Sequence, residues 1–321
     1  MGPDLDTSEL RSLLPELEIY DETADDEIAA RILGAEIVLG NKVMISDALF
    51  KGADDLRFIG LTATGTDNID LESARRHGVA VANIRAYCTA SVVEHVFGCL
   101  LSLTHQLQGY ASDVRAGAWQ EASNFCMLTR PIRELSSMTL GIVGFGELGR
   151  GVARMGEAFG MNVLVAARPG SNAVPAGRVT FDELLARADV ISLHCPLTDA
   201  TRNLFGRDQF AAMKRNAYLI NTARGALVDS AALVDALDDK EIAGAAIDVL
   251  PVEPPVDGDP LLDYAGDNLI VTPHIAWGTR EARQAAGADN LAGPLDDLPD
   301  ARRAEVVRLV EGHPAPFLVF G

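Results

Sequence analysis

This chain contains few cysteines and few lysines, and its acidic residues outnumber its basic ones. The four cysteines lie far apart, without CxxC spacing and without a histidine cluster beside them. This pattern argues against a zinc site and against a disulfide framework, so we expect no metal and reduced thiols. The formal charge is −19, and only Lys42, Lys51, Lys214 and Lys240 are lysines. Because nucleic acids and anionic lipids bind mainly to Lys and Arg, we expect no nucleic-acid and no membrane partner.

Long apolar runs are also missing. The longest, Val96–Leu103, is interrupted by Gly98 and Ser102, and it is far shorter than the ~20 residues that a membrane span needs. The first residues, Met1–Asp6, have neither the basic start nor the apolar core of a signal peptide. We therefore predict a cytoplasmic protein.

The chain does contain a regular alternation of short apolar runs with helical patterns. In its first part, strands are expected at Glu36–Leu39, Phe58–Ala63 and Val79–Ala82, with helices at Ala24–Leu33 and Leu71–His77. A second series of strands is expected at Thr139–Val143, Asn162–Ala166, Val190–His194, Ala217–Asn221, Gly244–Asp248 and Asn268–Thr272. Such alternation predicts parallel α/β sheets, and 321 residues are enough for two domains.

A long helical stretch joins the two series, and we expect it to begin near Ser91. The run Ser91-Val92-Val93-Glu94 has the spacing of a capping box, in which a hydroxyl and a carboxylate each bind a free N–H of the first turn. Glu94 is therefore interpreted as structural. We interpret His95, the next residue, as a packing or interdomain residue and not as a base.

A glycine-rich turn follows the first strand of the second series. Gly144, Gly146 and Gly149 give the spacing GxGxxG, directly after Val143 and at the start of a helix, with Glu147 and Leu148 between the last two glycines. The first glycine turns the chain, the second lets the backbone approach a pyrophosphate, and the third allows close helix–strand packing. Phosphate then binds at the helix N-terminus. This context predicts a dinucleotide site.

The position at which such proteins usually distinguish NAD from NADP does not have the expected acidic residue. The acid that accepts hydrogen bonds from the ribose 2′-hydroxyl is expected ~20 residues after the glycines, at the end of the next strand. Ala167 occupies that position, and Arg168 follows it. A guanidinium can bind a 2′-phosphate, so the predicted cofactor is NAD(P), with NADPH bound at least as well as NADH. The alternative is that Arg168 points into water.

Three segments with chemistry-bearing residues follow the last three strands. They contain Arg224, Glu253 and His274 respectively. Ligands of open α/β sheets bind beyond the carboxyl ends of the strands, so these side chains can converge there. Reduction of a 2-keto acid needs such a set, because Arg pairs with the carboxylate and His supplies a proton as hydride arrives at C2. The Glu favours the imidazolium and holds one tautomer.

Together with these segments, Ala63–Asp70 and Leu193–Thr198 make the sequence resemble the D-isomer-specific 2-hydroxyacid dehydrogenases. The resemblance runs from about Ala35 to Gln284, and within the family it is strongest to the glycerate dehydrogenase/hydroxypyruvate reductase group. It implies that Arg224, Glu253 and His274 are the catalytic residues. It also implies that Thr64, Gly65, Arg224 and His274 bind the substrate, with the Thr64 and Gly65 amides on its carboxylate. Further cofactor contacts are implied at Cys195, Pro196, Thr222, Ala223, Asp248 and Trp277.

The implied activity is hydride transfer between NAD(P)H and C2 of a small 2-keto or D-2-hydroxy acid. The first expectation is conversion of hydroxypyruvate or glyoxylate to D-glycerate or glycolate. Two alternatives stay open: another member of the family that acts on phosphoglycerate or a bulkier 2-keto acid, and a dinucleotide-sensing binding protein like the family's co-repressors. The resemblance also implies a homodimer, in which Phe125 can shape the partner's pocket, although Trp119 and Phe125 are equally compatible with ordinary interface or core positions.

The predicted fold class is α/β with two Rossmann-like domains. A doubly wound parallel-sheet dinucleotide-binding domain is expected over 92–282, and a smaller flavodoxin-like substrate domain over 1–91, completed by 283–321. The ends of the chain depart from the family pattern. Met1–Asp6 is too short and polar for the strand that relatives place before the helix expected at Thr7–Leu14, and Pro314 and Pro316 precede an apolar tail, Phe317–Phe320. We therefore expect the substrate domain to lack its opening strand.

Overall fold

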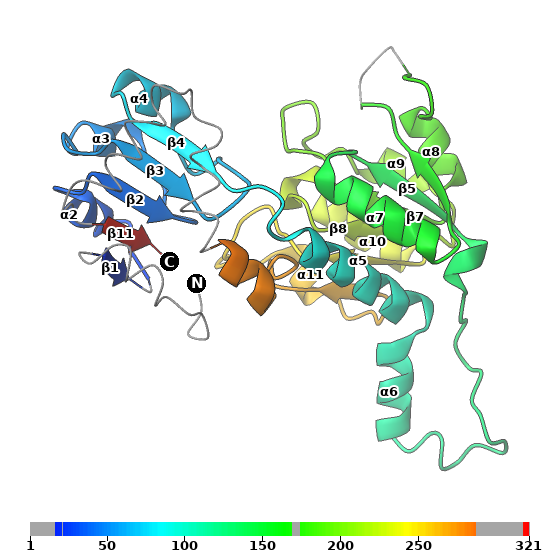
Figure 1. Ribbon diagram of the computed structural model, residues 1–321. Helices are drawn as coiled ribbons and strands as arrows, with labels where there is room; N and C mark the ends of the chain where they lie inside the picture. The colour runs from blue at the N-terminus through cyan, green and yellow to red at the C-terminus, as the bar shows by residue number, and fades with distance from the viewer. Residues whose placement is uncertain (1–16, 21, 169–173, 287–316, 321) are drawn as a thin grey trace. The chain divides into compact units, whose positions relative to one another are not determined.

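The computed structural model divides the chain into two compact units, one formed by Met1–Cys88 with Gly278–Gly321 and the other by Thr89–Trp277 (Figure 1). It describes residues 17–20, 22–168, 174–286 and 317–320. Within this described part, no helix has the length and apolar character needed to cross a bilayer. The predicted domain boundaries, and the assignment of one domain to the dinucleotide and the other to the substrate, stay predictions.

The smaller unit contains a five-stranded parallel sheet in the order β1-β11-β2-β3-β4. Its strands are β1 (Leu17–Tyr20), β2 (Ile37–Gly40), β3 (Phe58–Leu61), β4 (Ala80–Asn83) and β11 (Phe317–Phe320). Its labelled helices are α2 (Ile28–Ile32), α3 (Asp47–Phe50) and α4 (Leu71–Arg76). Every residue of β2 and β3 is buried, which is the pattern of interior parallel strands. The Asp70 carboxylate begins α4 by accepting the Ser73 N–H.

The position of β11 shows that the end of the chain adds a strand to this sheet, whereas Met1–Asp6, where the opening strand is expected to be missing, lies outside the described residues. The C-terminal residues Phe317–Phe320 lie between β1 and β2 and pair in parallel with both. An interior position of the sheet is thus occupied by a strand from the C-terminal end of the chain. Local sequence patterns cannot predict this, because strand pairing is a contact between distant segments. The helix expected at Thr7–Leu14 lies outside the described residues. Residues 280–286 are helical.

The larger unit is built on a six-stranded parallel sheet in the order β10-β9-β8-β7-β5-β6. Its strands are β5 (Thr139–Val143), β6 (Asn162–Val165), β7 (Val190–Leu193), β8 (Tyr218–Asn221), β9 (Gly244–Ile247) and β10 (Leu269–Val271). Its helices are α5 (Thr89–Thr104), α6 (Leu107–Arg115), α7 (Glu147–Ala158), α8 (Phe181–Arg187), α9 (Arg207–Ala212), α10 (Ser230–Asp238) and α11 (Pro260–Asp263). All six predicted strands are present, and the doubly wound prediction is confirmed.

Helix α5 corrects the predicted capping box. The helix begins at Thr89, so Ser91 lies inside its first turn and not at its N-cap. The Ser91 side chain is buried, and its hydroxyl donates to the Ala276 carbonyl at 2.6 Å, 185 positions away in the sequence. A tertiary partner therefore takes the hydroxyl that the local pattern assigned to the helix end. Gly151 allows α7 to approach this helix, because a Cβ there would lie 2.9 Å from Val93 Cγ2.

Candidate active site and dinucleotide site

The three residues expected to carry chemistry follow three neighbouring strands of the larger unit. Arg224 follows β8, Glu253 lies in the segment after β9, and His274 follows β10. These strands are adjacent and parallel, in the order β10-β9-β8. Their carboxyl ends therefore lie at one edge of the sheet, the edge at which open α/β folds bind ligands.

His274 and Glu253 are in direct contact. Nδ1 of His274 lies 2.6 Å from Oε2 of Glu253, and the two side chains are 26% and 29% exposed. A carboxylate can only accept, so the proton of this hydrogen bond belongs to Nδ1. The other carboxylate oxygen, Oε1, accepts the Leu250 N–H at 2.8 Å, which holds Glu253 in place. Nε2 is consequently the ring atom of His274 that can exchange a proton with a ligand.

The backbone around His274 is anchored by Asp248. His274 has φ +55°, a backbone conformation that is uncommon for residues other than glycine. Its N–H donates to the Asp248 carbonyl at 2.7 Å. The Asp248 carboxylate accepts the N–H groups of Ile275 and Ala276, both at 2.9 Å. On the other side, the Trp277 indole N–H donates to the His274 carbonyl at 2.9 Å. Asp248 and Trp277, both expected beside the cofactor, thus also fix the loop that contains His274.

Arg224 lies where the segments after β8 and β9 come very close. It is half-buried, and its Nη1 donates to the Ala223 carbonyl at 2.8 Å. The next residue, Gly225, begins the short 3-10 helix η2 (Gly225–Leu227). A Cβ on Gly225 would lie 1.9 Å from the Leu250 carbonyl carbon, so only glycine permits this approach. The glycine brings the Arg224 turn against the segment that contains Glu253.

The glycine turn has the shape of a phosphate cradle. Gly144 has φ +93°, and a Cβ there would lie 2.4 Å from the Cys195 amide nitrogen. A Cβ on Gly149 would lie 2.1 Å from the Gly144 carbonyl oxygen. Gly146 immediately precedes α7, whose first residues are Glu147 and Leu148. The Glu147 carboxylate accepts a hydrogen bond from the Thr89 hydroxyl, at the start of α5.

Two buried polar atoms at the same edge have no hydrogen-bond partner in the described structure. They are Thr222 Oγ1, after β8, and His194 Nδ1, after β7. His194 Nε2 contacts the Ser192 hydroxyl at 2.8 Å, and burial lowers the pKa of this imidazole to about 4. Cys195 is buried and Pro196 is exposed. Unsatisfied atoms beside a glycine cradle fit a polar ligand such as a dinucleotide.

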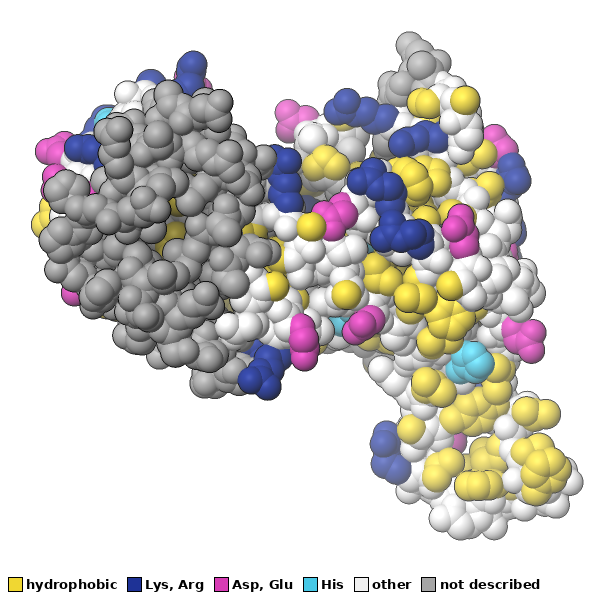
Figure 2. All heavy atoms as spheres, in the orientation of Figure 1, with side chains coloured by type: hydrophobic (Ala, Val, Ile, Leu, Met, Phe, Trp, Pro, Cys, Tyr) yellow, Lys and Arg dark blue, Asp and Glu magenta, His cyan; other side chains and the backbone are white. Residues whose placement is uncertain are grey.

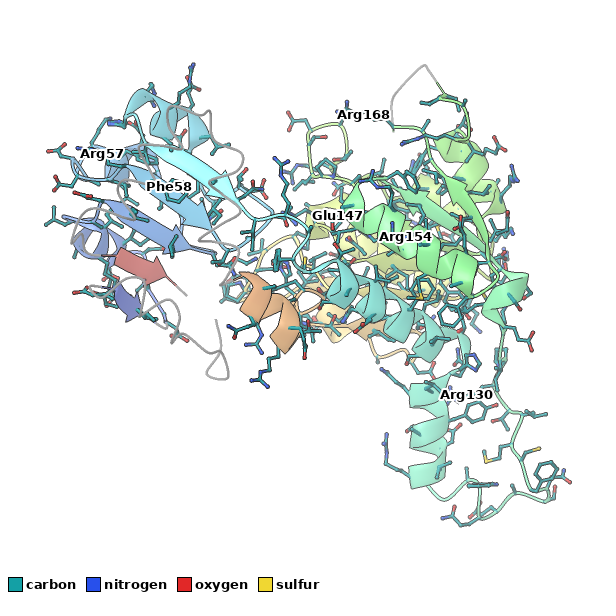
Figure 3. All side chains as sticks on the ribbon, in the orientation of Figure 1. Arg57, Phe58, Arg130, Glu147, Arg154 and Arg168 are labelled. Atoms are coloured by element: carbon teal, nitrogen blue, oxygen red, sulfur yellow. The ribbon has the colours of Figure 1, made fainter. Side chains whose placement is uncertain are left out.

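The strand after the glycine turn has two arginines near its end, not one. Arg168 is exposed, and Figure 3 shows it beside the loop after β6, with Glu147 and Arg154 on α7. The chain comes back to the same strand end at Arg178. The next residue, Val179, forms a β-bridge with Ala166, and the Val179 carbonyl accepts the Ala167 N–H. The Arg178 guanidinium lies over the Phe145 ring, 5.7 Å from the centroid. In Figure 2, basic side chains gather over the face that carries α7. Sequence reasoning missed Arg178 because it lies ten residues beyond Arg168.

Thr64 and Gly65 belong to the other unit and follow β3. Thr64 is exposed, and its carbonyl accepts the Asn83 side-chain amide at 2.6 Å. Asn68 ties the same loop to Asn41 and Val43 through their carbonyls, at 3.0 and 2.9 Å. The loop is therefore held by side-chain amides on both sides.

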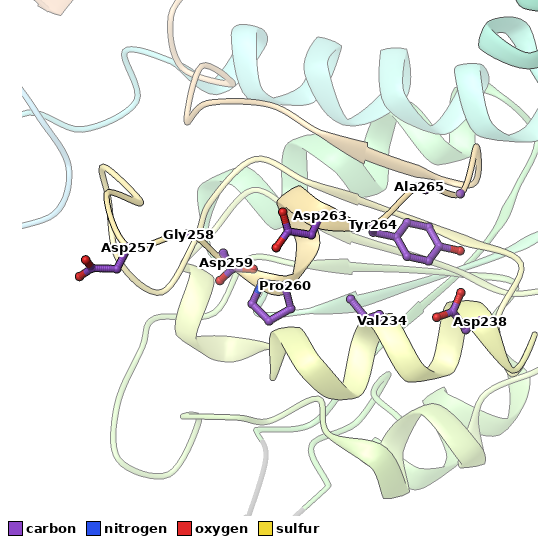
Figure 4. Close-up of a pocket in the computed structure, with 10 residues that line it drawn as sticks. Val234, Asp238, Asp257, Gly258, Asp259, Pro260, Asp263, Tyr264 and Ala265 are labelled. Carbon is purple, nitrogen blue, oxygen red and sulfur yellow. The ribbon is translucent and has the colours of Figure 1, made fainter.

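A hollow of about 680 Å³ on the larger unit is lined by residues of α10, α11 and their flanking segments, and by none of the site residues described above (Figure 4). Four aspartates line it: Asp238, Asp257, Asp259 and Asp263. Carboxylates repel phosphate, so this hollow does not fit a dinucleotide.

The doubly wound sheet, its glycine turn and the His–Glu pair define a dinucleotide-binding oxidoreductase. Residues 97–276 match the family model described as the NAD binding domain of D-isomer specific 2-hydroxyacid dehydrogenases. A glycerate dehydrogenase from Methylorubrum extorquens is 43% identical over 91% of this chain and 92% of its own length. A hydroxypyruvate reductase from Blautia hydrogenotrophica is 35% identical over 88% of both chains. The solved TT0316 protein of Thermus thermophilus is 35% identical, with a TM-score of 0.76 over 85% of this chain and 86% of that one.

This chain belongs to the D-isomer-specific 2-hydroxyacid dehydrogenase family. It is an α/β oxidoreductase that uses a nicotinamide dinucleotide and acts on a small hydroxy acid, and the co-repressor-like reading is not favoured.

Proposed function

We propose that the protein interconverts hydroxypyruvate and D-glycerate, and glyoxylate and glycolate, with His274 as the acid and base. The contact between His274 Nδ1 and Glu253 Oε2, at 2.6 Å, carries this proposal, because it leaves Nε2 as the proton-exchanging atom. The substrate class is supported by the names of two relatives, a glycerate dehydrogenase and a hydroxypyruvate reductase. Arg224 supplies the cation for the substrate carboxylate, and the Thr64 and Gly65 amides are proposed to bind the same group.

The residues of the chain perform the proton half of the reaction. When bound, the reduced nicotinamide supplies the hydride that forms the new C–H bond at C2. Arg224 pairs with the carboxylate and polarises the keto oxygen. Glu253 keeps one proton of the His274 ring on Nδ1. In the protonated ring, the second proton is therefore on Nε2, which faces the substrate. As the C=O π bond breaks, Nε2 gives this proton to the oxygen and a hydroxyl forms. In the reverse direction, neutral Nε2 takes the proton back.

We also propose that the protein binds NADPH at least as tightly as NADH. The glycine cradle holds the pyrophosphate, Thr222, Ala223 and Asp248 lie on the nicotinamide side, and Cys195 and Pro196 lie on the adenosine side. Ala167 offers no carboxylate to repel a 2′-phosphate. Arg168 and Arg178 supply two guanidinium groups near the end of β6, and neither has an ion-pair partner among the described residues. The proposed location is the cytoplasm, and the proposed assembly is a homodimer.

The test is turnover of a panel of 2-keto acids by the purified protein, with NADPH and NADH. Hydroxypyruvate and glyoxylate are expected to give the highest kcat/KM. Replacing His274 with Ala should lower kcat by ~10²–10⁴-fold, the usual contribution of a general acid. The matched control is His105→Ala, since His105 lies just beyond the end of α5. Near-normal turnover by His274→Ala would reject the assignment, and a preference for phosphoglycerate or bulky keto acids would move the protein to another branch of the family.

A further inference from the structure

We propose that His95, on α5, is a positioning residue that holds the catalytic His274 loop through Thr272 and Asp248. The inference rests on the proposed role of His274 and adds to it a residue interpreted above only as a packing or interdomain residue. His95, Thr272, Asp248 and His274 all belong to the larger unit.

The contacts form a directed chain of hydrogen bonds. His95 Nε2 lies 3.1 Å from Thr272 Oγ1, and Thr272 Oγ1 lies 2.6 Å from Asp248 Oδ1. An ionised carboxylate only accepts, so the single hydroxyl proton of Thr272 points to Asp248. The hydroxyl oxygen must then accept from His95, and Nε2 must carry a proton. The direct distance from Nε2 to Asp248 Oδ1 is 3.7 Å, too long for a hydrogen bond, so Thr272 is the necessary link.

Asp248 transmits this constraint to the catalytic loop. Its carboxylate binds the N–H groups of the two residues after His274, and its carbonyl binds the N–H of His274 itself. The φ of His274 is +55°, and such a backbone persists only where surrounding contacts over-determine it. If the carboxylate rotates, the loop loses the two hydrogen bonds after His274. The ring then no longer faces the substrate with fixed geometry, and small misplacements of catalytic groups reduce the rate strongly.

The surroundings explain why Asp248 needs this support. Asp248 is only 2% exposed, and no Lys or Arg of the described residues pairs with it. A buried carboxylate without a cation must be satisfied by hydrogen bonds. One turn after His95, α5 presents Cys99 to the same region. Burial, together with the charge of Asp248, raises the pKa of this thiol to about 11, so it stays neutral and adds no charge. His95, acting through Thr272, is thus the group that α5 offers the carboxylate.

The decisive comparison is between His95→Gln and His95→Leu. The Gln amide nitrogen can occupy the place of Nε2 and donate to Thr272, whereas Leu fills the space without a donor. We expect His95→Leu to lower kcat at least tenfold and His95→Gln to stay within about threefold of the wild type. The same split is expected for Thr272→Val against Thr272→Ser. Because the residues act in one chain, His95→Leu combined with Thr272→Val should be no worse than the more damaging single change.

Folding effects are separated from positioning by the Gln variant and by thermal unfolding of every protein. Equal loss of kcat in both His95 variants, or wild-type kcat in a folded His95→Leu, would overturn the inference. A ¹⁵N NMR spectrum of the wild type provides a readout independent of turnover: His95 should carry its proton on Nε2, and Thr272→Val should shift that signal. A neutral His95 protonated only on Nδ1 also overturns the inference. Full activity in His274→Ala rejects the proposed active site, whereas an inactive His274→Ala with a normal His95→Leu rejects the positioning role alone.

Discussion

Arg168 and Arg178 approach the end of β6 from two directions, one directly after the strand and the other after a loop that returns to it. Under the proposed cofactor assignment, a phosphate at the ribose 2′ position binds both guanidinium groups, and charge-assisted hydrogen bonds of this kind are among the strongest in proteins. Because NADH has no such phosphate, loss of either cation should affect the two cofactors unequally.

We expect Arg168→Ala and Arg178→Ala each to lower kcat/KM for NADPH by roughly tenfold, in line with the loss of one hydrogen bond to a charged group, and to leave kcat/KM for NADH within about twofold. Initial rates with both cofactors provide the measurement. Arg187→Ala is the control, since Arg187 pairs with Glu183 on the solvent-exposed part of α8. Equal effects on NADPH and NADH would show that these arginines do not read the 2′-phosphate.

His194 makes a pH-dependent contribution to stability. Burial holds the pKa of its imidazole at about 4 in the folded protein, below the ordinary 6.5 of an unfolded chain. Between these values the unfolded chain binds a proton that the folded protein does not. Stability from this group is therefore complete above pH 6.5 and declines as the pH falls towards 4.

In His194→Gln, the amide nitrogen can keep the Ser192 contact while the titration is removed. Thermal unfolding of the cofactor-free proteins should give a Tm that falls less between pH 6.5 and 4 in this variant than in the wild type. Parallel Tm curves for the two proteins would contradict the assignment.

At the scale of elements, β11 joins two strands of the smaller unit that come from the other end of the chain. Four residues pair with β1 on one side and with β2 on the other, in the interior of a sheet. Removing them leaves the facing backbone groups of two strands without partners, and unpaired buried N–H and C=O groups are costly. Deletion of residues 317–321 should therefore lower the Tm of the smaller unit by several degrees and raise its susceptibility to limited proteolysis. An unchanged melting curve would mean that this pairing contributes nothing.

Buried strands could be predicted from the sequence, whereas element ends that depend on distant contacts could not. Strands such as β7 and β8 are buried at every residue, so they appear in the sequence as short, mostly apolar runs and could be predicted nearly to the residue. The start of α5 was misplaced because the Ser91 hydroxyl binds a carbonyl far along the chain, and a local motif contains no information about such a partner. The same reasoning applies to β11, since strand order is decided by pairing between distant segments.

At the scale of the whole molecule, one part of the larger unit displays several exposed apolar side chains. Residues 107–134, named here the arm, comprise α6 and the following segment, which extends away from the sheet (Figure 1). Phe125 is 90% and Leu128 80% exposed, and Figure 2 shows apolar side chains gathered there. The arm is held in shape by Arg130, which pairs with Asp113 at 2.8 Å. Exposed apolar groups on a braced segment favour association.

If the arm forms the proposed homodimer contact, Phe125→Asp combined with Leu128→Asp should shift the protein from dimer to monomer. Size-exclusion chromatography with light scattering measures this directly. Leu33→Asp is the matched control, because Leu33 is 71% exposed but belongs to the smaller unit. A monomeric wild type, or a dimer that survives both arm changes, would refute the assignment of this surface.

The sequence by itself determined the family, the glycine turn and the chemistry-bearing residues at the strand ends, because binding a pyrophosphate and reducing a keto acid demand particular residue types at fixed places on a parallel sheet. Only the tertiary structure decided what supports them. His95 and Thr272 are 177 residues apart, β1 and β2 are joined by the C-terminal strand, and Arg178 reaches Ala166 from across a loop. Such contacts depend on how distant segments pack, and no local pattern specifies them.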